Sequence, residues 1–312
     1  MAKPRIMLVG AGSMGANHAR VVAASARADL MAVVDPRGDV AGPIAERYGA
    51  TWLPAPDFDG VDAVIVAAAT EAHPDVAAQV MAAGKPLLLE KPLAPGLAES
   101  EAIVAESRRQ GLPLMCGFVE RYNPAVVTAR RLIAAPVYLS SQRHSPYLGR
   151  IATGVSWDLL VHDVDLSIQL TGSAPTDVRA RLGHYSPEST AEDVADVIVG
   201  FESGAMANLS AARIGQRKVR TLVIHELDRL IELDLLRRAV TIYRHVSGAV
   251  SDDGRGYRQQ TIIEIPELVT NQEPLAAQFD RFVDLLEGTV DADAERDSIL
   301  PSHRVIAQVE GR

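Results

Sequence analysis

Short apolar runs alternate with longer segments of helical periodicity through the first part of the chain. Apolar runs bounded by polar residues or glycine predict buried strands at 5–9, 30–34, 61–68, 87–90 and 114–118. The segments between them predict helices at 16–26, 39–48, 73–83 and 95–110. Strands that alternate with helices of this length indicate a parallel, doubly wound sheet of the α/β class.

The pattern changes after Val119, where strands begin to outnumber helices. Helices are predicted at 124–134, 156–170 and 274–287. Strands are predicted at 137–143, 193–201, 205–211, 218–227, 230–235 and 239–243, with a flexible hairpin loop at 247–256. We therefore expect an N-terminal Rossmann domain at 1–119. At 120–312 we expect an α+β domain on an open, largely antiparallel sheet, which binds substrate and mediates oligomerisation.

The composition excludes several classes of protein. The chain has 312 residues, enough for two domains, and a formal net charge of −9 with a pI of about 5.4, which argues against nucleic-acid or anionic-membrane partners. The one cysteine, Cys116, excludes an intrachain disulfide and a cysteine-based zinc site. Because there is neither a bilayer-length apolar stretch nor a signal-peptide pattern, we expect a cytoplasmic enzyme or sensor.

A glycine-rich turn follows the first predicted strand. Gly10, Gly12 and Gly15, with Ser13 and Met14 between them, form G-x-G-x-x-G at the start of a predicted helix. The first glycine permits the tight turn, the second lets the backbone approach a pyrophosphate, and the third lets the helix pack on the strand. The helix N-terminus supplies N–H groups for the phosphates, so the turn predicts a dinucleotide site.

The second predicted strand ends at Asp35, about 20 residues beyond Gly15, the spacing expected for an acid that binds a ribose 2′-hydroxyl. Asp35 would repel a 2′-phosphate, which favours NAD. Arg37 is able to reach such a phosphate, so NADP stays open.

Two further patterns are candidates for catalysis. Lys91 in Glu90-Lys91-Pro92 follows a predicted strand, where open α/β sheets bind ligands, and Pro92 biases it toward an extended conformation. In the helix at 156–170, Asp158, His162 and Asp165 are spaced to share one face. The alternative for Asp158 and His162 is a simple helical ion pair. Since this helix offers no further ligand donor, we expect no metal site.

Together these segments resemble the Gfo/Idh/MocA oxidoreductase family over nearly the whole chain. The resemblance rests on G-x-G-x-x-G with His18, 69–73 (Ala-Thr-Glu-Ala-His), 83–94 around Glu-Lys-Pro, Asp158-x-x-x-His162-x-x-Asp165, and Glu273-Pro274-Leu275 with Phe279, Phe282 and Gly288. Near the expected site the chain departs from the commonest family pattern at Thr70-Glu71, Thr153-Gly154 and Leu160. These departures bear on the identity of the substrate more than on the type of reaction.

The resemblance implies a catalytic group of Lys91, Asp158 and His162. Histidine suits the general base that removes a hydroxyl proton, the aspartate orients the imidazole, and the lysine stabilises a developing alkoxide. The cofactor set that we assign comprises Gly10, Gly12, Ser13, Met14, Gly15, Asp35, Arg37, Ala68, Thr70, His73, Glu90 and Lys91.

The substrate set that we assign adds four residues to the catalytic group. The segment 120–124 (Glu-Arg-Tyr-Asn-Pro) resembles one in family members that act on nucleotide-linked amino sugars, which implicates Arg121, Asn123, Arg143 and Arg150. Arginines suit phosphate binding through paired hydrogen bonds, although Arg143 and Arg150 are equally well explained as surface residues. We expect NAD(P)-dependent oxidation of a ring secondary hydroxyl in a sugar, sugar phosphate or nucleotide sugar, with a cyclitol as the next choice.

Two alternatives use the same fold. One is a non-catalytic NAD(P)-binding sensor, which the complete catalytic group disfavours. The other is a reductase of imines or of a linear tetrapyrrole, which has no evident need for both Asp158 and His162. An open sheet commonly has its second face covered, so we expect a homodimer or homotetramer.

Overall fold

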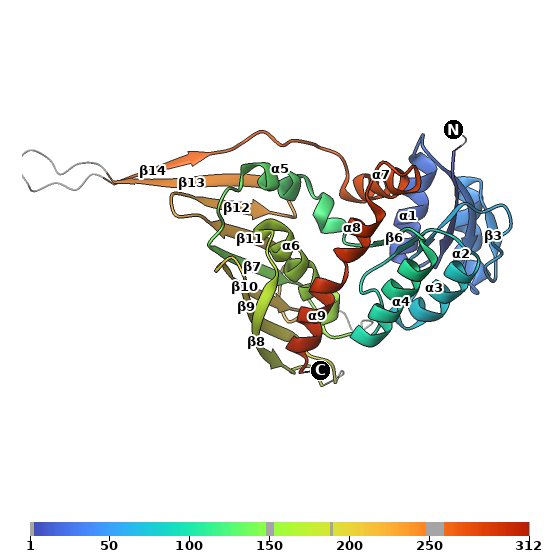
Figure 1. The fold of residues 1–312 in the computed structure, drawn as a ribbon, viewed down its shortest axis with the longest axis horizontal. Coiled ribbons are helices and arrows are strands. Elements are labelled where there is room, and N and C mark those ends of the chain that lie inside the picture. Colours follow the sequence, from blue (N-terminus) through green and yellow to red (C-terminus); the bar gives the residue numbers. More distant parts are fainter. Residues whose placement is uncertain (1–2, 148–152, 188–189, 248–258, 312) are drawn as a thin grey trace, which may run out of the picture. The chain divides into compact units, whose positions relative to one another are not determined.

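A computed structural model of the chain describes residues 3–147, 153–187, 190–247 and 259–311 (Figure 1). The chain forms two compact units. The first contains Met1–Val119 and Glu273–Arg304, and the second contains Glu120–Gln272 and Val305–Arg312. The hairpin loop expected at 247–256 lies, after Ser247, outside the described residues, and so does Arg150.

The first unit is built on a six-stranded sheet with the order β3-β2-β1-β4-β5-β6. All of its strand pairs are parallel, which confirms the predicted doubly wound sheet. The strands are β1 (Arg5–Val9), β2 (Asp29–Val34), β3 (Thr51–Leu53), β4 (Ala63–Val66), β5 (Leu87–Leu89) and β6 (Leu114–Cys116). The sequence pattern missed β3, because this short edge strand is largely exposed and lacks an apolar run.

The helices of the first unit lie close to their predicted positions, except the short helix at 292–297, which the sequence pattern missed. They are α1 (Ser13–Ala24), α2 (Gly38–Tyr48), α3 (His73–Ala82), α4 (Leu97–Gln110), α7 (Pro274–Leu286) and α8 (Ala292–Asp297), with a 3-10 turn η1 (Thr70–Ala72) before α3. Gly111 takes the left-handed conformation at the end of α4, a common way for helices to end. The order of the strands reverses between β1 and β4, because the chain first builds the sheet outward to β3 and then, from β4, outward on the other side. In such sheets ligands bind beyond the carboxyl ends of the strands at this switch point.

Helix α7 packs within the first unit, although we expected all residues after 119 to form one second domain. Its apolar side is buried through Phe279 and Phe282. Arg27, just after α1, donates to Asp284 at 2.7 Å and to Glu287 at 2.9 Å. An amphipathic helix stabilises whichever surface buries its apolar side, and the sequence pattern alone does not identify that surface.

The second unit is built on an eight-stranded sheet with the order β14-β13-β12-β11-β7-β10-β9-β8. Only β7 and β10 pair in parallel, so the predicted largely antiparallel sheet is confirmed. The strands are β7 (Tyr138–His144), β8 (Pro175–Gly183), β9 (Val194–Phe201), β10 (Met206–Ala212), β11 (Val219–His225), β12 (Leu230–Asp234), β13 (Ala239–Ser247) and β14 (Gln259–Glu264).

Helices cover one face of this second sheet. They are α5 (Pro124–Leu132), preceded by the 3-10 turn η2 (Val119–Tyr122), and α6 (Val161–Thr171), preceded by the π-helical turn η3 (Ser156–Leu160). Residues alternate between buried and accessible along β9, where Val197 and Val199 are buried but Ile198 is 43% exposed. The other face therefore carries accessible apolar side chains. A last helix, α9 (Leu300–Val309), ends the described chain.

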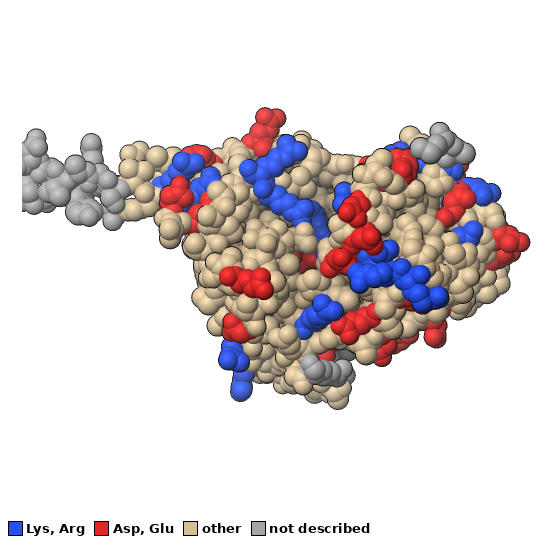
Figure 2. All heavy atoms as spheres, in the orientation of Figure 1, with Lys and Arg blue, Asp and Glu red and all other residues tan. Residues whose placement is uncertain are grey.

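No helix in the described chain is long and apolar enough to cross a membrane. Among the residues drawn in colour in Figure 2, basic and acidic side chains lie interspersed on the face shown.

Candidate functional site

A cavity of about 660 Å³ lies in the first unit at the carboxyl ends of β1, β2 and β4. Seven members of the predicted cofactor set line it: Gly10, Gly12, Ser13, Met14, Asp35, Arg37 and Ala68. Among its other lining residues are Val34, Pro36, Pro54, Pro56, Ala67, Ala69 and Val76, which make the wall largely apolar. A concave, mostly apolar cavity with a few polar groups is typical of small-molecule sites. The other predicted members, Gly15, Thr70, His73, Glu90 and Lys91, do not line it.

The three motif glycines have different surroundings. A Cβ atom on Gly10 would lie 2.5 Å from the carbonyl oxygen of Ala67, and one on Gly15 would lie 1.9 Å from that of Gly10. These two positions therefore need glycine for packing of the turn and of α1. A Cβ atom on Gly12 would meet nothing within 4 Å, so this residue borders open space where a pyrophosphate could approach the backbone.

Asp35 is held at the end of β2 in its ionised form. Its carboxylate accepts hydrogen bonds from the backbone N–H groups of Ala11 and Arg37, each at 3.0 Å, and from the Arg37 guanidinium at 2.9 and 3.0 Å. The Arg37 guanidinium, assisted by the two backbone donors, lowers the pKa of Asp35 to about 2 despite burial. Arg37 is thus directed at Asp35, and NADP binding would require this contact to open. This geometry favours NAD.

Buried histidines anchor the segment that carries Lys91. His18 Nε2 lies 2.8 Å from Glu90 Oε1, and His73 Nδ1 lies 3.0 Å from the Pro92 carbonyl oxygen. Burial lowers the pKa of His73, which favours its neutral form. His73 therefore acts in this structure on the backbone beside Lys91; its expected cofactor contact stays a prediction.

A third histidine, which sequence reasoning missed, holds the other side of the same segment. His303 Nδ1 donates to the Ile299 carbonyl at 2.9 Å, so its Nε2 accepts from the Leu93 N–H at 3.1 Å. The ring is fully buried and packs edge-on against Phe118. His303 lies 210 residues from Leu93 in the chain, and no local pattern connects the two. The backbone on both sides of Lys91 is therefore fixed from several elements.

In the second unit, Asp158 lies in the π-helical turn η3, whereas His162 lies in α6. The helix predicted at 156–170 is present, but its first turn is wound as a π-helix. Glu192 accepts from the Ser156 N–H at 2.9 Å, and its carboxylate fills the place of a Cβ on Gly154, 2.1 Å away. π-Helical turns occur frequently at functional sites.

Arg213 also holds this turn. Its Nη2 donates to the Thr153 carbonyl at 2.6 Å and lies 3.6 Å from Asp158 Oδ2. The Arg213 side chain is 4% exposed and that of Asp158 is 24% exposed, so the carboxylate remains accessible. Sequence reasoning missed Arg213 and Glu192, because they enter the site from β10 and the segment before β9. Lys91 belongs to the first unit, whereas Asp158 and His162 belong to the second.

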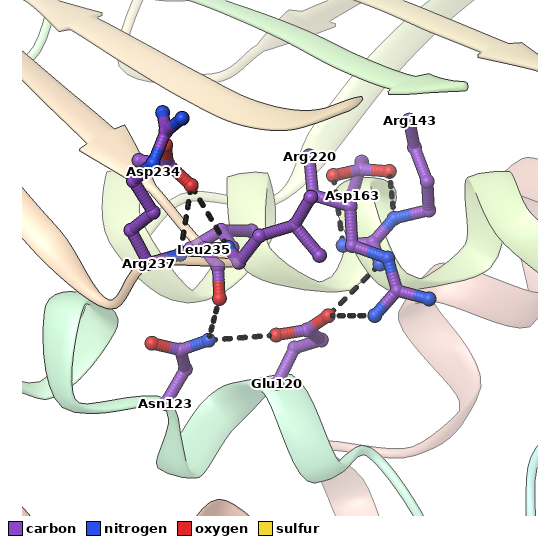
Figure 3. A network of polar contacts seen from close by, with 9 residues as sticks. Glu120, Asn123, Arg143, Asp163, Arg220, Asp234, Leu235 and Arg237 are labelled. Carbon is purple, nitrogen blue, oxygen red and sulfur yellow. Dashed lines mark hydrogen bonds and ion pairs between the residues drawn. The ribbon is translucent and has the colours of Figure 1, made fainter. Parts of the chain in front are cut away.

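The other acids of this helix face buried arginines, as Figure 3 shows for Asp163. Arg143 donates to Asp163 at 2.6 Å and to Glu120 at 2.9 Å, while Arg121 forms two bonds with Asp165 at 2.8 and 2.6 Å. The three residues that were predicted to share one face, Asp158, His162 and Asp165, therefore differ in their surroundings, since Asp165 is engaged by Arg121. Burial raises the pKa of Asp163. For Arg143, burial is outweighed by Asp163 and Glu120, which raise its pKa.

The predicted substrate residues Arg121, Asn123 and Arg143 are each at most 8% exposed. Asn123 caps α5 through Ala125 N–H and donates to Glu120 and to the Leu235 carbonyl. This geometry favours structural roles for the three residues, and their substrate contacts stay a prediction that it does not support. Among the described residues, no three His, Cys, Asp or Glu side chains form a group that could hold a metal ion.

The glycine geometry yields a paired test. Gly15→Ala is expected to lower the free energy of unfolding by about 1–3 kcal/mol, because the added methyl overpacks the turn. Gly12→Ser is expected to leave unfolding unchanged, since serine is a good N-cap, but to weaken NAD binding at least about tenfold by entering the cavity. Chemical denaturation and calorimetric titration of NAD measure the two effects. Equal NAD affinity in Gly12→Ser and wild type would contradict the assignment.

Asp35 yields a test of cofactor choice. Asp35→Asn removes a charged acceptor, so NAD affinity is expected to fall about tenfold or more while NADP is relatively favoured. The lowered pKa means that Asp35 stays ionised from pH 5 to 9, and NAD affinity is expected not to titrate with it there. Its contribution to stability is present above the unfolded pKa and is lost as the pH falls toward about 2. An unchanged ratio of NAD to NADP affinity in the variant would refute this role.

Comparisons with known proteins cover most of the chain. Residues 4–118 match the model described as oxidoreductase family, NAD-binding Rossmann fold, and residues 126–226 match the GFO/IDH/MocA C-terminal domain. The chain is 30% identical to a UDP-N-acetylglucosamine 3-dehydrogenase of Acidithiobacillus ferrooxidans over 90% of this chain and 88% of that protein. It is 30% identical to the scyllo-inositol 2-dehydrogenase (NAD(+)) of Bacillus subtilis over 67% of each.

A solved structure gives the same likeness at the level of fold. The UDP-N-acetylglucosamine 3-dehydrogenase GnnA from Acidithiobacillus ferrooxidans superposes with a TM-score of 0.85 at 28% identity, covering 100% of this chain and 99% of that chain. Two domain models in the expected order and a relative matched over nine-tenths of the chain leave one assignment. The chain belongs to the Gfo/Idh/MocA family of oxidoreductases, whose N-terminal domain is an NAD-binding Rossmann fold.

Proposed function

We propose that this oxidoreductase uses NAD to oxidise a ring secondary hydroxyl of a sugar, with a nucleotide-linked sugar as the preferred substrate. The observation that carries the proposal is the accessible Asp158 carboxylate, held by Arg213 one helical turn before His162. Support for the substrate class comes from the 30% identity with a UDP-N-acetylglucosamine 3-dehydrogenase over 90% of this chain. The inositol dehydrogenase relative supports a cyclitol as the second choice.

The cofactor cavity fits NAD in shape and chemistry. Gly12 leaves room for the pyrophosphate beside the N-terminus of α1, and Asp35 presents an ionised carboxylate for a ribose hydroxyl. Ala68 and Val76 supply apolar surface. Bound NAD would supply the hydride acceptor.

The chain's own residues would handle the proton and orient the alcohol. We assign His162 as the general base that accepts the hydroxyl proton, and Asp158 as the group that stabilises the protonated imidazole. Arg213, whose Nη2 lies 3.6 Å from Asp158 Oδ2, would orient this carboxylate. Lys91, on a backbone segment anchored by His73 and His303, is assigned to hydrogen-bond the substrate oxygen and stabilise developing negative charge.

Steady-state assays test this reaction. Wild type is expected to form NADH with at least one member of a panel of UDP-sugars, sugar phosphates, free sugars and inositols. His162→Asn and Lys91→Met are expected to lower kcat by about 10²–10⁴-fold, because each removes a group that acts on the reacting oxygen. Their NAD dissociation constants are expected to match wild type.

An exposed residue away from the site supplies the control. Arg179→Gln on β8 is expected to retain full activity. Tight NAD binding by wild type without turnover of any panel member would overturn the enzymatic proposal and favour a ligand sensor.

We also propose that the chain assembles as a homodimer or homotetramer through the uncovered face of the second sheet. Ile198 and Met206, on the paired strands β9 and β10, are each 43% exposed there. Accessible apolar residues on an open sheet face are commonly covered by a second copy.

Light scattering coupled to size exclusion measures this assembly. Wild type is expected to elute as a dimer or tetramer, and Ile198→Glu to shift toward monomer because it places a charge in the interface. Arg109→Gln, on α4 of the first unit where the side chain is 70% exposed, serves as the surface control. A monomeric wild type would rule out the assembly.

A further inference from the structure

Three arginines lie at one end of the central strands β11, β7 and β10 of the second unit's sheet, near the turn that carries Asp158. Arg143 on β7 and Arg220 on β11 are directly paired in register, so both side chains project from the covered face. Arg213 directly follows β10, whose Ala211 pairs with Arg143. The fold thus gathers three guanidinium groups from separate strands beside the proposed reaction centre.

Two of these arginines are enclosed by protein groups. The side chain of Arg143 is 2% exposed and lies between Asp163 and Glu120. That of Arg213 is 4% exposed and faces the Thr153 carbonyl and Asp158. Neither presents its guanidinium to solvent, so neither is placed to receive a charged group from outside.

Arg220 differs from both, because its side chain is 38% exposed. Its contact with Glu120 is 3.3 Å long, and the same Oε1 atom accepts the shorter 2.9 Å bond from Arg143 (Figure 3). Glu120 therefore compensates two guanidinium groups with one oxygen, and Arg143 is the nearer of them. A guanidinium fork has five N–H donors, and this single long contact leaves donor capacity at Arg220.

The electrostatic surroundings of Arg220 agree with this geometry. Burial and the adjacent Arg143 lower the pKa of Arg220, and the compensation by Glu120, Asp163 and Asp158 is incomplete. An oxyanion at the exposed side of the fork would relieve the repulsion from Arg143. Arg220 lies at the same end of the central strands as Arg213, which contacts Asp158, so such an anion would lie on the side of the proposed reaction centre.

We propose that Arg220 is a specificity-determining residue that binds a phosphate oxyanion attached to the sugar substrate. The role of Arg220 in substrate choice rests on the proposed function, because it assumes that the protein oxidises a sugar. The arginine that distinguishes a phosphate-bearing sugar from a neutral one is then the partly exposed Arg220, not the buried Arg143 beside it. Arginine suits this role because its planar fork matches two phosphate oxygens.

Binding of uridine diphosphate to the NAD-saturated protein tests the site without turnover. Calorimetric titration is expected to show binding to wild type, at least tenfold weaker binding to Arg220→Gln, and unchanged binding to Arg179→Gln. Arg220→Lys, which keeps the charge without the fork, is expected to fall between wild type and Arg220→Gln. Thermal melting of each variant checks that the Glu120–Arg143 network remains folded. Equal affinity in wild type and Arg220→Gln would overturn the proposal.

Kinetics with paired substrates separate this proposal from the reaction itself. For UDP-N-acetylglucosamine, Arg220→Gln is expected to raise KM at least tenfold with kcat largely kept. For a neutral cyclitol or sugar, KM is expected to stay unchanged. A KM that rises equally for both kinds of substrate, or wild-type binding of glucuronate but not of uridine diphosphate, would refute the phosphate role. A wild type that binds uridine diphosphate yet oxidises nothing would retain the anion site and end the dehydrogenase proposal.

Discussion

The position of the helix that carries His162 depends on one buried charge. The guanidinium of Arg143 on β7 is enclosed by Asp163 of α6 and by Glu120 of η2, the 3-10 turn before α5. Removing one partner from such a buried pair costs about 3–5 kcal/mol, because the remaining charge is uncompensated. The contact therefore fixes α6 against the sheet, and with it the direction in which His162 and Asp158 leave the helix. The second acid of the helix, Asp165, is held in the same way by Arg121.

The same logic explains why only part of the polar surface of α6 is available for chemistry. Asp163 and Asp165 are almost fully buried and satisfied by arginines, whereas the side chain of Asp158 is 24% exposed. Asp158 lies in η3, which is wound as a π-helix and is held at its start by Glu192 and Arg213. The two buried acids and the accessible Asp158, to which we assign a catalytic role, thus differ in which groups enclose them.

In the first unit, preorganisation comes from hydrogen bonds made by buried histidines. His73 and His303 contact the backbone at Pro92 and Leu93, and His18 contacts the carboxylate of Glu90. Each ring is buried, so these bonds are protected from water. A lysine whose flanking backbone is fixed loses less conformational freedom when it engages a substrate than one on a mobile loop. This is the physical basis for giving Lys91 a catalytic role.

The sequence by itself determined the parallel sheet, the dinucleotide turn and the family, because these depend on local periodicity and on residues at fixed short spacings. Gly10, Gly12, Gly15 and Asp35 are recognisable for that reason. Only the tertiary structure decided which arginines are buried and which are accessible, since exposure depends on strands that are distant in the chain. The sequence alone does not distinguish Arg143 from Arg220. In the structure the two are paired across β7 and β11, yet the side chain of Arg143 is buried and that of Arg220 is partly exposed. Likewise, the hydrogen bond between His303 and Leu93 joins residues that are 210 positions apart in the chain. The sequence pattern of α7 shows that it has an apolar side, but only the structure shows that this side is buried in the first unit.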